Sequence, residues 1–71
     1  MKMTKEEVKA VVIGKIKYWE KIRKHLPTSH PSYQIEYGHG LAIGMLIAFQ
    51  IAGFLSSKEF VEIKDEVLEL M

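Results

Sequence analysis

Hydrophobic residues recur at helical spacing through the first third of the chain. Six of them fall on one stripe of a helix, with lysines on its other faces: Val8, Val11, Val12, Trp19, Ile22 and Leu26. Thr4 and Glu7 have the spacing of a capping box, and Pro27 disfavours helical geometry in the residue before it. The pattern predicts a long amphipathic helix over residues 4–26. Gly14 costs this helix about 1 kcal/mol relative to alanine, so we expect a neighbouring helix to approach closely there.

A proline-containing loop separates this helix from a much more apolar segment. The loop reads LPTSHPSY, and Ser32 near its end is expected to cap a second helix over residues 33–52. Between Leu41 and Leu55 the only polar residue is Gln50. Small residues recur four apart at Gly40, Gly44, Ala48 and Ala52. A helix that is apolar nearly all round is buried nearly all round, which predicts that other helices cover this one.

The end of the second helix and the start of a third are both marked in AGFLSSKEF. Gly53 suits a left-handed helix stop, Phe54 can fold back on the last turn, and Ser56 with Glu59 repeats the capping-box spacing. A short acidic helix over residues 57–70 follows, with an apolar stripe made of Phe60, Ile63, Val67 and Leu70. The sequence therefore predicts one all-α domain over residues 1–71, an α-hairpin with a third helix packed across it, completed by dimerisation.

Composition and charge favour self-association and an intracellular setting. A chain of 71 residues buries a small core, and without cysteine it has no disulfide to stabilise it. Residues 1–25 hold eight Lys or Arg against three Glu, and residues 58–71 hold two Lys against five acids. These basic and acidic ends can complement each other within one chain or between two. The amino terminus lacks the continuous apolar run of an export signal, which predicts a cytoplasmic protein.

Three interpretations of the second helix follow from the residues. A membrane span needs about 20 apolar residues, more than this segment supplies, so the membrane is not favoured. Glu36 and His39 have the Glu-x-x-His spacing of helical metal sites, and Glu20 is a candidate third ligand, although two residues are a weak motif. Burial by a second copy of the chain is the favoured interpretation.

We predict that this second copy makes a homodimer, or a larger symmetric bundle, with the second helix at its centre. The predicted interface residues are Gly40, Ile43, Gly44, Leu46, Ile47, Ala48, Gln50, Ile51 and Phe54. A two-fold axis is expected to bring Gln50 near its own copy, where a buried amide can fix the register of the helices. The alternative is a monomeric three-helix bundle with a few exposed apolar residues.

No motif predicts catalysis or a cofactor. Ser29, His30 and Ser32 are neighbours in a loop rather than an oriented triad, and GHGLAIG has neither a preceding strand nor a P-loop lysine. We therefore expect a protein that is not an enzyme and needs no cofactor. The basic first helix offers a possible nucleic-acid contact through four lysines, Lys9, Lys17, Lys21 and Lys24, although a solvated helix face is the commoner role of such residues.

The glycine-rich apolar helix followed by AGFLSSKEF and an acidic helix resembles the small helical proteins often encoded by Gram-positive bacteria and their phages. The resemblance covers about the last half of the chain, names no family and carries over no site residue. It implies an accessory or regulatory protein that acts by contact. The leading hypothesis is a homodimeric interaction protein that binds another macromolecule, an unknown protein being the favoured partner.

Overall fold

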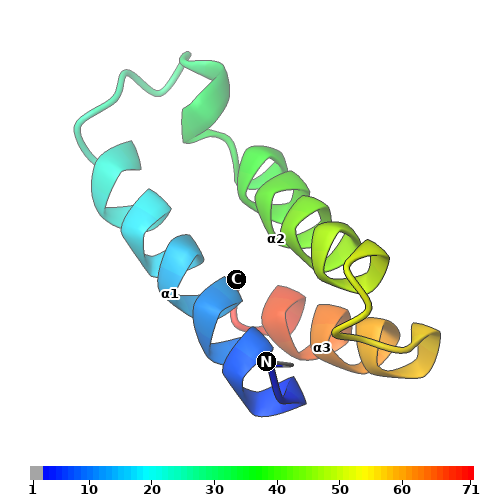
Figure 1. Ribbon diagram of the computed structural model, residues 1–71. Coiled ribbons are helices and arrows are strands. Elements are labelled where there is room, and N and C mark those ends of the chain that lie inside the picture. The colour runs from blue at the N-terminus through cyan, green and yellow to red at the C-terminus, as the bar shows by residue number, and fades with distance from the viewer. Residues whose placement is uncertain (1–2) are drawn as a thin grey trace.

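Three α-helices and one short 3-10 helix form the part of the chain that this computed structural model describes, residues 3–71 (Figure 1). They are α1 (Lys5–Arg23), η1 (Pro31–Tyr33), α2 (Ile35–Ile51) and α3 (Ser57–Glu69). Helices α1 and α2 run antiparallel as a hairpin, and α3 packs across its open end, against both helices (Figure 1). Residues 3–71 contain no strand, so the predicted all-α fold with three helices is confirmed.

Both predicted capping boxes are present. At the start of α1, the Thr4 hydroxyl accepts the Glu7 N–H at 3.1 Å, and the Glu7 carboxylate accepts the Thr4 N–H at 3.0 Å. Ser56 and Glu59 repeat the arrangement with the same two distances at the start of α3. Each box gives partners to backbone N–H groups that a helix end leaves free, which fixes where the two helices begin.

The predicted stop after α2 is a complete Schellman motif. Gly53 takes the left-handed conformation with φ of 85°, and its N–H bonds to the Gln50 carbonyl at 3.0 Å. The Phe54 N–H bonds to the Phe49 carbonyl at 2.9 Å, and the two phenyl rings lie 6.1 Å apart. This pair of hydrogen bonds and the apolar contact together satisfy the last carbonyls of α2 and turn the chain toward α3.

The helix ends beside the first loop differ from the prediction. Helix α1 ends at Arg23 rather than residue 26, because the N–H groups of His25 and Leu26 bond to carbonyls three residues back instead of four. Ser32 does not cap α2, so that prediction is wrong. Ser32 lies in η1, where its N–H bonds to Nδ1 of His30 at 3.0 Å. Gln34 precedes α2 without a side-chain cap.

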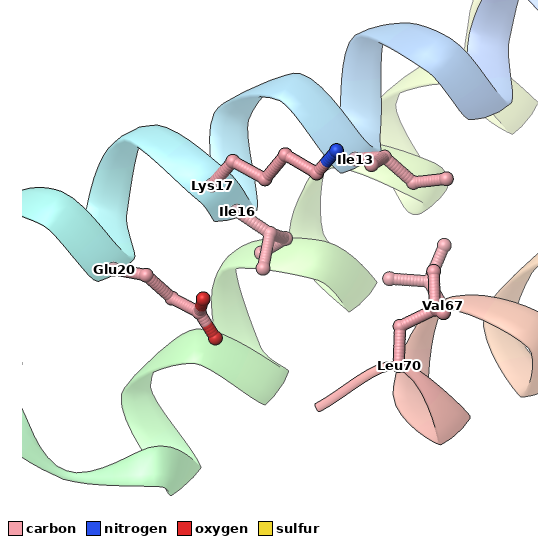
Figure 2. A pocket seen from close by; sticks show the side chains of 6 residues that line it. All are labelled: Ile13, Ile16, Lys17, Glu20, Val67 and Leu70. Atoms are coloured by element: carbon pink, nitrogen blue, oxygen red, sulfur yellow. The ribbon is translucent and has the colours of Figure 1, made fainter.

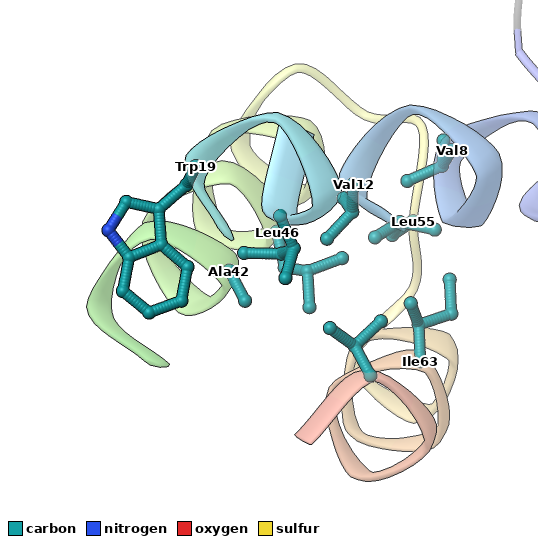
Figure 3. Close-up of a cluster of buried hydrophobic side chains, with 9 residues drawn as sticks. Val8, Val12, Trp19, Ala42, Leu46, Leu55 and Ile63 are labelled. Carbon is teal, nitrogen blue, oxygen red and sulfur yellow. The ribbon is translucent and has the colours of Figure 1, made fainter. Parts of the chain in front are cut away.

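Nine buried apolar side chains form one core between the three helices: Val8, Val12, Ile16, Trp19, Ala42, Leu46, Leu55, Ile63 and Val67 (Figure 3). Three residues of the predicted apolar stripe of α1 are among them: Val8, Val12 and Trp19. The predicted stripe is wrong at Val11 and Ile22, which are 39% and 41% exposed. Both line hollows on the side of the hairpin that α3 leaves uncovered.

Glycine packing also departs from the prediction. A Cβ atom placed on Gly14 would meet nothing within 4 Å, so the expected close approach of a neighbouring helix there is wrong within this chain. Gly38 is the glycine that makes such an approach, since a Cβ at this position would lie 2.4 Å from the Trp19 ring. The Met71 methyl would lie 2.6 Å away. Gly38 therefore allows Trp19 to pack directly against the backbone of α2.

Candidate interaction surface

The two sides of the α1–α2 hairpin differ in what covers them. On the α3 side, Val67 and Leu70 lie opposite Ile13 and Ile16 across a hollow of about 320 Å³, with Lys17 and Glu20 also lining it (Figure 2). On the other side, hollows of about 350 and 330 Å³ are lined by α1, α2 and the connecting segments, without any residue of α3. Met45 lines both, so they adjoin along the hairpin.

Exposed apolar residues concentrate on α1 and α2. Of the eight large apolar side chains that are exposed within residues 3–71, six belong to these two helices, and only Val61 and Leu70 lie elsewhere. We call nine exposed residues of the hairpin the open face. Val11, Tyr18 and Ile22 on α1 and Tyr37 and Ala48 on α2 line the two adjoining hollows, and Gly40, Gly44, Ile47 and Ile51 lie on the outward side of α2. Lys15 is the one charged residue that lines the two adjoining hollows in the described part of the chain.

The outward side of α2 is the part of the open face that its own chain leaves most bare. Ile51 is 82% exposed and Ile47 is 44% exposed. Between them and the start of the helix, a Cβ atom placed on Gly40 or Gly44 would have nothing within 4 Å. Gly40 and Gly44, two of the small residues spaced four apart, therefore have no close neighbour among residues 3–71, and another helix backbone could come close to them.

The predicted interface residues divide into three groups. Gly40, Gly44, Ile47, Ala48 and Ile51 are exposed, whereas Ile43, Gln50 and Phe54 are half-buried. Leu46 is fully buried in the chain's own core and is therefore not available to a partner. The Gln50 amide donates a hydrogen bond to Oγ of Ser57 at 3.1 Å, so it has a polar partner without its own copy.

Two ion pairs join the amino-terminal half of α1 to α3. Lys5 pairs with Glu62, and Lys9 pairs with Glu66. The hydrogen bond to each glutamate raises the pKa of its lysine, and the hydrogen bond from Lys9 lowers the pKa of Glu66. The charge complementarity predicted from the sequence thus operates within the chain at these positions. Because the pairs are partly open to solvent, each contributes little to the stability of the fold.

Charge is nevertheless unevenly distributed along the molecule. We call residues 15–40 the hinge end: they hold five cations against Glu20 and Glu36, a net charge of +3. We call residues 3–14 and 41–71 the α3 end: they hold four cations against seven acids, a net charge of −3. The molecule is 39 Å long and 19 Å wide, so opposite charges gather toward its two ends.

The four lysines predicted to contact nucleic acid differ in whether they form an ion pair. Lys9 is engaged with Glu66, whereas Lys17, Lys21 and Lys24 are exposed and make no ion pair within residues 3–71. Lys17 and Lys21 lie four residues apart on one face of α1, and Lys24 is the capping residue directly after this helix.

Trp19 joins α1 to the loop that follows it. The sequence pattern indicated only that this residue belongs to the core. Its indole N–H donates to the Ser32 carbonyl at 2.7 Å, which ties the loop to α1. The Arg23 guanidinium lies 4.8 Å from the centre of the Trp19 ring and 4.7 Å from that of Tyr33. The spacing of Trp19 and Arg23, four residues apart on a helix, is a signal from which this stacking could have been predicted.

The metal-site and membrane interpretations of the second helix gain no support from the described residues. Of the proposed metal ligands, Glu36 is exposed and His39 and Glu20 are half-buried, and the described residues contain no group of three or more His, Asp or Glu side chains that could hold a metal ion. Within residues 3–71, no helix has the length and apolar character needed to cross a bilayer. Comparison of the chain with protein-family models, curated proteins and solved structures yields no match.

Proposed function

We propose that this chain is a small helical interaction module without catalytic activity, which works as a homodimer and binds another macromolecule. The open face of the hairpin supports this proposal. Exposed apolar patches of this kind typically mark the sites where a protein meets a partner. A second copy is the partner we propose for it.

The size of the chain supports self-association as well. The core contains nine buried residues, and a domain of this length buries only about 60% of the surface that its unfolded chain exposes. A standard interface removes about 800 Å² from each partner. Against an accessible surface of 4822 Å², that is about one sixth of the molecule, so dimerisation would enlarge the buried apolar area substantially.

A pair of matched variants tests the homodimer. Ile51→Asp adds a charge to the open face at a side chain that is 82% exposed in one chain, so folding of the monomer should change little. Val61→Asp makes the same chemical change on α3, at a side chain that is 47% exposed and outside the open face. In sedimentation equilibrium, we expect Ile51→Asp to be monomeric and Val61→Asp to remain dimeric. Equal behaviour of the two variants would contradict the proposal.

Nucleic-acid binding is the second candidate function, and the unpaired lysines Lys17, Lys21 and Lys24 favour it. Such binding would act through phosphate contacts and would weaken steeply with salt. Electrophoretic shift of a DNA duplex at low salt tests it, with the triple Lys→Gln variant at these positions as the comparison. Absence of a shift by the unmodified chain at low salt would exclude this candidate.

A further inference from the structure

We infer that the two copies in the proposed homodimer pack antiparallel along α2, with a two-fold axis passing next to Gly44. The inference rests on the proposed homodimer and adds the orientation of the second copy. It depends on two independent properties of the described residues. The first is the set of α2 side chains that the chain itself leaves exposed, and the second is the separation of charge between the hinge end and the α3 end.

The exposed residues of α2 are arranged to match an antiparallel copy. Around an axis at Gly44, Gly40 of one chain would face Ala48 of the other, and Tyr37 would face Ile51. Small residues therefore meet small residues near the axis, where the helix backbones can approach closely. Larger apolar side chains meet one another farther out, at positions that are 43% and 82% exposed in the single chain. A C2 interface requires self-complementarity of this kind.

The charges of the two ends favour the same orientation. Antiparallel packing brings the hinge end of one copy, with net charge +3, beside the α3 end of the other, with net charge −3. Parallel packing would instead place ends of like charge together. Complementary potentials across an interface select the orientation of partners and suppress the mismatched one.

Single cysteines give a direct test, since the chain has none of its own. Tyr37→Cys and Ile51→Cys are each oxidised alone and as an equimolar mixture. In the antiparallel dimer the two sites face each other, whereas copies of the same site are separated by much of the length of the helix, about 20 Å at 1.5 Å per residue. A disulfide needs Cα atoms roughly 4.4 to 6.8 Å apart.

We expect a disulfide between the two variants in the mixture and none in either variant alone. A disulfide within each variant alone would show parallel packing and overturn the inference, as would the absence of any disulfide. The mass of the unmodified chain separates the two proposals. A monomer removes the homodimer itself, whereas a dimer with the wrong disulfide pattern removes only the orientation.

Salt provides a second measurement that needs no substitution. Raising the salt concentration from about 0.05 M to about 1 M shortens the Debye length from more than 10 Å to about 3 Å and screens the charged ends. We expect the dissociation constant of the antiparallel dimer to rise over this range. A fall in the dissociation constant would indicate that ends of like charge are adjacent and would contradict the inference.

Discussion

Substitution of Gly38 by alanine tests how α1 and α2 are held together at the hinge. The added methyl group would lie 2.4 and 2.5 Å from two carbons of the Trp19 ring and 2.6 Å from the Met71 methyl. The ring cannot easily yield, because its N–H is hydrogen-bonded to the Ser32 carbonyl at 2.7 Å and Trp19 is only 5% exposed. Gly38→Ala should therefore force the two helices apart or break the loop contact.

The expected loss follows from two opposing effects. Overpacking a buried site costs about 1 to 3 kcal/mol, and three contacts this short favour the upper part of that range. Alanine in place of glycine inside a helix returns about 1 kcal/mol. The net expectation is a loss of about 2 kcal/mol in the free energy of unfolding, or a fall of roughly 8 to 16 °C in the melting temperature of a domain of this size.

Gly14→Ala is the matched control, because its added methyl group has nothing within 4 Å. It should raise stability by up to about 1 kcal/mol through helix propensity alone. Urea unfolding at one fixed protein concentration measures both variants, followed by the fluorescence of Trp19, the single tryptophan. A Gly38→Ala chain at least as stable as the unmodified one would refute the packing described here.

Other substitutions test the core, the turn and the ion pairs. Leu46→Ala removes a fully buried side chain and should cost about 3 kcal/mol in urea unfolding; a cost below about 1 kcal/mol would contradict its central position. Gly53→Ala puts a Cβ on a residue with φ of 85° and should lower stability by about 1 kcal/mol in the same assay, so an unchanged midpoint would argue against the left-handed turn. The pKa values of Glu7 and Glu66 are lowered in the folded chain from the ordinary 4.5, the first by the Thr4 backbone N–H and the second by Lys9. Their contribution to stability is therefore present above pH 4.5 and is lost as the pH falls through the lowered values, so thermal unfolding should show a decline in acid that is shallower in Glu66→Gln. An identical decline in that variant would mean that the Glu66 carboxylate does not contribute.

Local chemistry explains which parts of the fold could be predicted from the sequence. A capping box or a Schellman motif involves residues within about six positions of one another, so Thr4, Gly53 and Ser56 indicate helix ends without reference to the rest of the chain. The first loop was harder to predict, because Ser32 lies inside η1 and α2 begins only at Ile35, a placement that the residue types of the loop did not reveal.

Packing across helices could be predicted only in part. A hydrophobic stripe identifies the buried side of a helix but not its width, which depends on how many neighbours cover it. Trp19 was therefore assigned to the core correctly, while Val11 and Ile22 were not. The same limit applies to glycines: Gly38 and Gly44 look alike in the sequence, and only the placement of Trp19 distinguishes the buried one from the bare one.

The candidate surface was predictable in outline and not in detail. The excess of apolar residues on α2 indicated that one side would stay uncovered, and Gly40, Gly44 and Ile51 lie on that side. Leu46 and Ile47 are both apolar, so the residue types did not show which of the two would be buried. Adjacent helical residues point about 100° apart, and the positions of α1 and α3 decide which direction faces the core. The separation of charge between the two ends likewise depends on where α3 lies.

The mass of the unmodified chain in solution tests the proposed homodimer most directly. One chain has a mass of 8.2 kDa, and light scattering at micromolar concentrations should give twice that value. The apparent mass should fall on dilution as the two copies separate. A folded, soluble protein whose mass stays at that of one chain across the whole concentration range would contradict the account.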